Sequence, residues 1–219
     1  MPQKNVSPIR HPAEAGAFIL DWDGVLADTR LNFRALRQKY FDGKIVPLIE
    51  AAANLPAQVR AEALAEIRAI EMEGAERATP VPGAKDLIAW LDTPGTLGGK
   101  PWAVVSRNCR DSIVLAAGKC GIVLPSVFLC REDPYVKPDP RALALAAERL
   151  GASLSGCVMV GDFVYDLQAA RDASIPSVLV KNPATSPPGV RAEWEDLADF
   201  VYESMGDFVR DLRAFEAAS

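Results

Sequence analysis

Two aspartates, Asp21 and Asp23, follow the short apolar run 18–20 and are themselves followed by Gly24. In an extended segment residues i and i+2 point to the same side, so both carboxylates are expected to face one pocket. One carboxylate can attack phosphorus as a nucleophile, while the other protonates the leaving oxygen and later activates water. Gly24 lets the backbone turn and approach a ligand closely. The segment favours phosphate chemistry, although a solvated acidic turn is the plainer interpretation of Asp-Gly.

Further residues suited to the same chemistry follow other apolar segments of the chain. Ser106, Lys137 and Asp162 each come after a predicted strand, and Asp166 lies shortly after Asp162. Parallel strands bring their carboxyl ends to one edge of a sheet, where the ligand crevice of an open α/β fold lies. We therefore expect one crevice to contain four acids, a hydroxyl group and a lysine.

The clustered acids predict a divalent metal. Carboxylates without a cation would repel one another and raise their pKa values, whereas Mg²⁺ with oxygen ligands removes that penalty. Magnesium usually takes one or two carboxylates and retains waters, which suits Asp21 and Asp162 as ligands with Asp166 in support.

The remaining polar residues predict a phosphate site. Lys137 would neutralise phosphate charge and restrain the nucleophile. Ser106 is expected at the start of a helix, where its hydroxyl and free backbone N–H groups form an anion site. We include the adjacent Arg107, together with Gly24, among the residues predicted to bind the phosphate.

These side chains require a parallel sheet to position them. Strands separated by helices of 9 to 13 residues indicate right-handed βαβ units and an α/β fold. Apolar runs predict strands near 17–21, 102–105, 127–130, 157–160, 177–180 and 199–202. Periodic segments predict helices near 84–91, 107–119, 139–150, 164–172 and 206–216.

The rest of the chain divides into a leader, a core and an insertion. Residues 1–15 lack periodicity and contain three prolines, so we predict a flexible leader. Residues 30–79 have a helical pattern that interrupts the α/β alternation and predict a helical insertion. The core domain is then formed by residues 16–29 and 80–219.

Composition excludes several classes of protein. A net charge of -5 argues against a nucleic-acid-binding protein, which needs a clustered basic face. No apolar stretch is long enough to predict a membrane span or a signal peptide, so a cytoplasmic location is expected. The four cysteines lack Cys-x-x-Cys spacing and are predicted to be reduced core thiols. His11 is the only histidine, which excludes histidine-based triads and His-rich metal sites.

Four motifs in order resemble those of the haloacid dehalogenase (HAD) superfamily, in its branch of phosphatases similar to phosphoglycolate phosphatase and β-phosphoglucomutase. The resemblance covers roughly residues 17–203. The motifs are Asp21-Trp22-Asp23-Gly24-Val25 with Asp28-Thr29, Ser106-Arg107-Asn108, Val136-Lys137-Pro138-Asp139, and Gly161-Asp162-Phe163-Val164-Tyr165-Asp166. Each motif is weak alone, but four at consistent strand ends are a strong signal.

The resemblance implies a Rossmann-like three-layer core with a mostly parallel sheet and a small helical cap inserted after the first strand. It also implies Asp21 as the nucleophile, Asp23 as the general acid/base, and Ser106 and Lys137 as phosphate ligands. Mg²⁺ would be bound by Asp21, Asp162 and the backbone carbonyl of Asp23. The implied function is hydrolysis of a small phosphorylated metabolite through an aspartyl-phosphate intermediate.

The resemblance leaves alternatives within the family. Asp23 argues against dehalogenases, which lack this second acid and magnesium. A phosphonoacetaldehyde hydrolase would need a cap lysine, for which Lys39 and Lys44 are available. A β-phosphoglucomutase-like mutase is the closer rival, but that group carries a histidine where this chain has Phe33. A non-catalytic phosphate-binding protein would be expected to have lost one of the catalytic residues.

Substrate specificity is expected to depend on the insertion. Arg34 and Arg37 are three residues apart and could share one helix face toward an acidic substrate. Trp22 is either a core residue or part of the pocket wall. The expected partner is a small phosphorylated molecule, with no membrane or nucleic-acid partner, and the sequence leaves open whether the protein is a monomer or a dimer.

Overall fold

A six-stranded parallel sheet forms the centre of the protein, as predicted. The computed structural model describes residues 9–95, 97–182 and 191–219. The strands have the order β5-β4-β1-β6-β7-β8, and every neighbouring pair is parallel. They are β1 (Ala17–Leu20), β4 (Trp102–Val105), β5 (Phe128–Leu129), β6 (Cys157–Gly161), β7 (Ser177–Val180) and β8 (Phe200–Tyr202).

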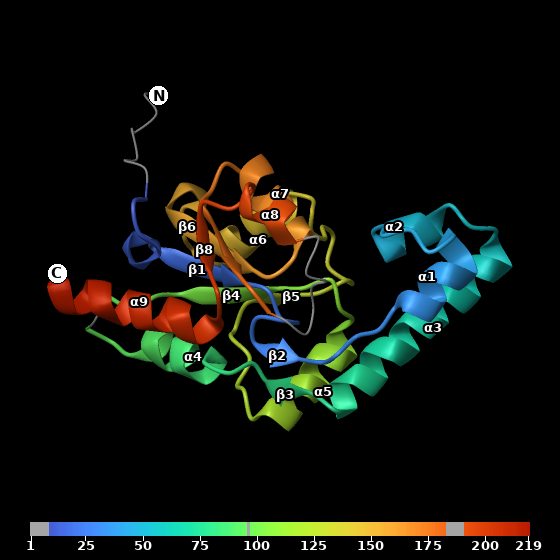
Figure 1. Cartoon of the computed structure of the whole chain (residues 1–219), viewed down its shortest axis with the longest axis horizontal. Coiled ribbons are helices and arrows are strands. Elements are labelled where there is room, and N and C mark those ends of the chain that lie inside the picture. Colours follow the sequence, from blue (N-terminus) through green and yellow to red (C-terminus); the bar gives the residue numbers. More distant parts are fainter. Residues whose placement is uncertain (1–8, 96, 183–190) are drawn as a thin grey trace.

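Helices cover both faces of the sheet and make three layers (Figure 1). On β1, Phe18 and Leu20 pack among residues of α4 (Ala84–Asp92), α5 (Arg110–Cys120) and α9 (Met205–Ala218). The alternate residues Ala17 and Ile19 pack against α6 (Arg141–Leu150) and α7 (Val164–Asp172). All four residues of β1 are fully buried, which explains why this strand is an unbroken apolar run.

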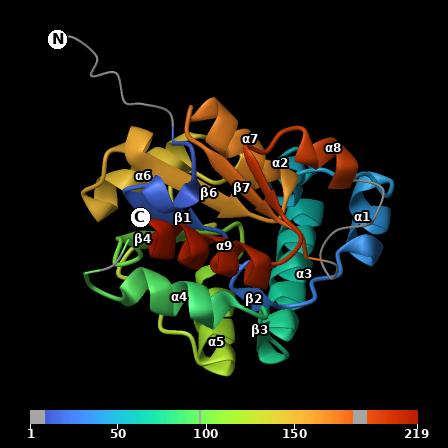
Figure 2. The same ribbon diagram turned by 60° about the vertical axis from the view of Figure 1, so that its left-hand side comes forward.

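Three helices form the predicted insertion, here called the helical insertion: α1 (Arg34–Phe41), α2 (Leu48–Ala53) and α3 (Ala57–Glu76). It begins and ends at a short antiparallel pair, β2 (Ala27–Asp28) and β3 (Thr79–Pro80), which the sequence pattern did not predict. The insertion has a small core of its own around Leu36, Leu48 and Ile67. Figure 2 shows α3 running from this core back to α5 and the β2–β3 pair.

Part of the predicted flexible leader is packed onto the core. A short 3-10 helix covers Pro12–Glu14, and Ala13 and Ala15 are fully buried. The His11 ring stacks on Phe215 of α9 with 4.1 Å between centroids. The prediction of a loose segment is therefore wrong for residues 11–15, because a proline at the first helical position and an apolar docking surface order them. Residues 1–8 lie outside the described part of the chain.

The prediction about the cysteines is confirmed. All four cysteines are buried free thiols, as predicted. Within the described residues, no helix combines the length and the apolar character that crossing a membrane requires.

The short helix α8 (Arg191–Glu195) contributes Trp194 to a small apolar cluster with α7 and β7.

Candidate active site

The predicted nucleophile, Asp21, lies directly after β1 in contact with a buried lysine. Lys137 Nζ is 2.8 Å from Asp21 Oδ1 and 2.5 Å from Asp166 Oδ1, and its side chain is 1% exposed. Burial alone would lower the pKa of Lys137, but the carboxylates of Asp166 and Asp21 outweigh burial and raise the pKa. Lys137, in the loop after β5, thus places a charged ammonium group between two acids.

Three acids meet at the carboxyl ends of β1 and β6, the two central strands. Asp21, Asp162 and Asp166 each offer a carboxylate oxygen, and these oxygens all lie within 4.8 Å of one another. Burial and the nearby Asp21 charge raise the pKa of Asp166 to about 6, although Lys137 opposes the shift. One lysine does not balance three carboxylates, so the oxygen-rich cluster fits a hard divalent cation such as Mg²⁺.

Two glycines make room for these acids. A Cβ atom on Gly24 would lie 2.0 Å from Asp162 Oδ2, and one on Gly161 would lie 2.3 Å from the Asp166 Cβ. Gly24 also has a φ of +81°, a conformation that other residues adopt at a cost. Gly24 was predicted to bind phosphate, and the structure shows that its lack of a side chain lets Asp162 approach Asp21.

Asp23 is held by a residue to which the sequence pattern assigned no role. The backbone N–H of Thr29 donates to Asp23 Oδ1 at 3.0 Å, and the Thr29 hydroxyl donates to the same oxygen. Burial raises the pKa of Asp23 to about 7 despite these hydrogen bonds, and the charge of Asp21 adds to the effect. A carboxyl group with a pKa near 7 suits a group that must both donate and accept a proton.

Asp23 should make the metal-free protein less stable as the pH rises. Its folded-state pKa of about 7 exceeds an unfolded value near 4, so the folded state binds more protons between these pH values. Stability is therefore lost as pH rises through this window. We expect Asp23→Asn to remove on the order of 1 to 3 kcal/mol of the decrease between pH 5 and pH 8.

The measurement is thermal or urea unfolding in a chelator at both pH values. Asp42→Asn is the matched control, because Asp42 is 90% exposed on the helical insertion. An equal loss of stability in wild type and Asp23→Asn would contradict the raised pKa.

Ser106 lies at the end of β4, but it does not begin a helix as predicted. The helix α5 begins at Arg110 with Cys109 as its N-cap, because Cys109 has an extended backbone. The buried Ser106 hydroxyl oxygen instead accepts a hydrogen bond from the backbone N–H of Asn108 at 3.2 Å. Ser106 and Asn108 still line the same pocket as Asp21.

Arg107 connects the core to the helical insertion. Its guanidinium donates to both carboxylate oxygens of Glu50 on α2, at 3.1 and 2.7 Å, and to the backbone carbonyl of Lys137. It also lies over the Tyr165 ring, 4.9 Å from the centroid. Arg107 was predicted to bind phosphate, and in the structure its charge is paired with Glu50.

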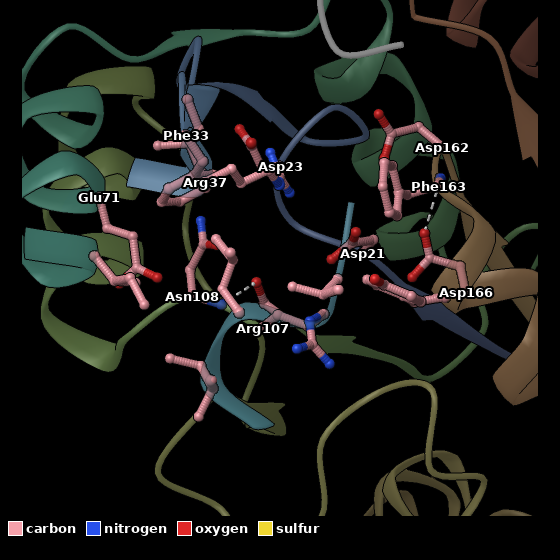
Figure 3. Close-up of a pocket in the computed structure, with 17 residues that line it drawn as sticks. Asp21, Asp23, Phe33, Arg37, Glu71, Arg107, Asn108, Asp162, Phe163 and Asp166 are labelled. Carbon is pink, nitrogen blue, oxygen red and sulfur yellow. Dashed lines mark hydrogen bonds between the residues drawn. The ribbon is translucent and has the colours of Figure 1, made fainter. Parts of the chain in front are cut away.

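A cavity of about 210 Å³ lies between the sheet edge and the helical insertion. Its acidic side consists of Asp21, Asp23, Asp162 and Asp166, as Figure 3 shows. The side facing them is mostly apolar and is formed by Leu31, Phe33, Val46, Leu48, Ile49 and Ile67. The space therefore combines a charged side, suited to a phosphate, with an apolar side.

The structure separates the three predicted specificity residues. Arg37 lines the cavity, whereas Arg34 is exposed and does not. Side chains of a helix lean toward its N-terminus, so Arg34, the first residue of α1, extends beyond the cavity. Trp22 is fully buried in the core and is absent from the cavity wall, which favours the core role for this residue.

Sequence reasoning missed Glu71, a buried acid within α3. It is 3% exposed, accepts from Arg131 at 2.7 Å and from the backbone N–H of Cys109 at 3.1 Å. Burial raises the pKa of Glu71, while Arg131 opposes the shift. These contacts anchor α3 to the loop before α5. A signal was present, because Glu71 shares the buried helix face of Ile67 and Ala75.

The two lysines available for Schiff-base chemistry lie away from the cavity. Lys39 pairs with Glu66, and Lys44 lies 3.8 Å from Asp42. The Lys39 side chain is 53% exposed and that of Lys44 is 72% exposed. Neither lines the cavity, so the structure gives no support to a phosphonoacetaldehyde hydrolase mechanism.

Comparisons with known proteins extend the geometric findings. A family model described as haloacid dehalogenase-like hydrolase matches residues 15–174. Phosphoglycolate phosphatase of Caulobacter vibrioides is 32% identical over 117 residues, which cover 52% of this chain and 47% of that protein. Hexitol phosphatase A of Escherichia coli is 31% identical over 125 residues, covering 57% of this chain and 55% of that protein. The match thus spans about half the length of these curated relatives.

Solved structures match over more of the chain. The crystal structure of a hydrolase from Pseudomonas syringae has a TM-score of 0.70 and 25% identity, and it covers 91% of this chain and 98% of that one. The agreement thus covers nearly the full length of both chains.

Proposed function

Because the chain belongs to the haloacid dehalogenase-like hydrolase family, we propose that it is a Mg²⁺-dependent phosphatase acting on a small phosphorylated metabolite. The substrate would be a phosphoglycolate- or sugar-phosphate-like monoester. The observation that carries the proposal is the position of Asp21, with oxygens of Asp162 and Asp166 within 4.8 Å and Lys137 2.8 Å away. Such a site can bind a phosphate dianion only with a further cation.

In the proposed reaction Asp21 attacks the phosphorus atom and forms an aspartyl-phosphate. The bond between phosphorus and the leaving oxygen breaks, and Asp23 donates its proton to that oxygen. A water molecule then attacks the phosphorus of the aspartyl-phosphate and gives a proton to Asp23, while the bond between phosphorus and the Asp21 oxygen breaks and its electron pair returns to the carboxylate. Inorganic phosphate leaves and both aspartates return to their starting states.

The chain's own residues would hold the metal and the phosphate in place. Asp21, Asp162 and the backbone carbonyl of Asp23 would bind Mg²⁺, with Asp166 in support. The bound ion would neutralise the acids and stabilise negative charge on the transferring phosphoryl group. Lys137 would orient Asp21 while sharing its charge with the phosphate oxygens.

The loop after β4 would complete the phosphate site. Ser106 lines the same cavity as Asp21, and its hydroxyl group would donate to a phosphate oxygen. Arg107 can reach a phosphate only by leaving Glu50. Its proposed role therefore requires that the helical insertion moves relative to the core.

The helical insertion would serve as the mobile cap of the enzyme. It covers the acidic end of the cavity with apolar side chains, which would exclude bulk water during phosphoryl transfer. The buried free thiols of all four cysteines fit a reducing compartment, and we propose a cytoplasmic location.

A phosphomutase is less well supported. Phe33 lines the cavity at the position where the resemblance places a histidine in the mutase group. Phenylalanine cannot exchange a proton, so a mutase would need another group to do so.

Hydrolysis of an aryl phosphate tests the proposed function. We expect phosphate release by the purified protein with Mg²⁺ and none above background in a chelator. Phosphorylated metabolites then compete with the aryl phosphate to rank the natural candidates. Absence of phosphate release with Mg²⁺, Mn²⁺ or Co²⁺ would overturn the proposal.

A further inference from the structure

Arg37 is a cation that faces the cavity without a charged partner among the described residues. It lies on α1 of the helical insertion, and its side chain extends toward the acidic side of the cavity (Figure 3). Its Nε atom is buried and has no hydrogen-bond acceptor in the described structure. Its guanidinium lies 5.7 Å from the Phe33 ring centroid, which holds it against the apolar wall.

The other cations near the cavity are already neutralised. Lys137 is shared by Asp21 and Asp166, and Arg107 is paired with Glu50 at 2.7 Å. Glu71, the acid that the insertion contributes to the cavity wall, is bound by Arg131 at 2.7 Å. Among the described residues, no acid forms an ion pair with Arg37, so its charge is available to a ligand.

Partial burial of this group is unfavourable. It removes part of the hydration of the guanidinium and accordingly lowers the pKa of Arg37. An anionic ligand group placed against the guanidinium would restore both the charge balance and the hydrogen bond to Nε. Because only a substrate with such a group would restore these interactions, the enzyme would select for substrates that carry one.

We propose that Arg37 recognises a carboxylate on the substrate, so that the enzyme acts on short phosphorylated carboxylic acids. This inference rests on the proposed phosphatase function and deepens it. A carboxylate carries one negative charge, which matches the single charge of Arg37. A second phosphoryl group would bring an excess negative charge into a cavity that already contains four aspartates. The cavity of about 210 Å³ also suits a compact substrate.

Pairs of substrates that differ only in the carboxylate test the inference. Phosphoglycolate is compared with 2-hydroxyethyl phosphate, and 3-phosphoglycerate with glycerol 3-phosphate. We expect the wild-type protein to prefer the acid by about 10- to 100-fold in kcat/KM, the range for a charged hydrogen-bonded pair. Arg37→Met should reduce this preference to near one, and Arg37→Lys should keep part of it.

Arg34→Met is the matched control, because Arg34 lies on the same helix but outside the cavity, and its preference should equal that of wild type. The inference is overturned if wild type hydrolyses both members of a pair equally. It is also overturned if Arg37→Met slows both members equally, since Arg37 would then bind the transferred phosphate. Hydrolysis of an aryl phosphate by wild type separates these results from failure of the proposed function, in which no substrate is hydrolysed.

Discussion

Replacing Asp21 by asparagine is expected to lower kcat for an aryl phosphate by about 10⁴-fold or more, because the amide cannot act as the attacking nucleophile. The side chain keeps its size, and Lys137 keeps its contact with Asp166 at 2.5 Å. The variant should therefore fold normally. Its circular dichroism spectrum and unfolding temperature should stay close to those of wild type.

Asp42→Asn serves as the control for this substitution, since Asp42 is an exposed acid outside the cavity. It should retain full activity. Acid-quenched wild type mixed with substrate should gain the mass of one phosphoryl group on the peptide that contains residue 21. Near-normal turnover by Asp21→Asn, or phosphoryl label on another residue, would show that the nucleophile lies elsewhere.

Removal of divalent cations is expected to reduce activity to background, and addition of Mg²⁺ should restore it. Asp21, Asp162 and Asp166 each have a carboxylate oxygen within 4.8 Å of the others, and Lys137 contacts Asp21 and Asp166. Without a divalent cation they would repel a phosphate dianion. Asp162→Asn removes one of the charges and should require a higher Mg²⁺ concentration for half-maximal activity.

Unfolding measurements give a second readout that does not depend on turnover. Mg²⁺ should raise the stability of wild type by about 2.7 kcal/mol at a concentration 100 times its Kd. The increase should be smaller for Asp162→Asn at the same concentration. Full activity in a chelator, or equal Mg²⁺ responses of both proteins, would contradict the proposed metal site.

Much of the sheet could be predicted because each central strand of this fold has a recognisable local sequence pattern. Each central strand is buried on both faces and reads as an unbroken apolar run, and each run ends at a residue suited to a ligand site. The β2–β3 pair was missed because it contains only two residues on each side and includes Pro80. Its pairing joins Ala27 to Pro80 and Asp28 to Thr79, which lie 53 and 51 positions apart, and no local pattern reports such a contact.

The predicted start of α5 failed for a related reason. The backbone N–H of Asn108 donates to the Ser106 hydroxyl oxygen, but no helix begins there because Cys109 has an extended backbone. The N–H of Cys109 donates to Glu71 of α3, which lies 38 positions earlier, a contact that no local pattern reports.

The sequence by itself determined the reactive groups of this protein, because apolar runs, acid spacing and glycine are properties of neighbouring residues. Only the tertiary structure decided which charges are paired. Lys137 meets Asp21 across 116 positions, Glu71 meets Arg131 across 60, and Arg37 meets no acid among the described residues. Arg34 and Arg37 look equivalent in sequence, but the placement of α1 leaves Arg34 exposed and puts Arg37, partly buried, in the cavity wall. Burial and pairing set the cost of a charge, and both depend on segments distant in the chain.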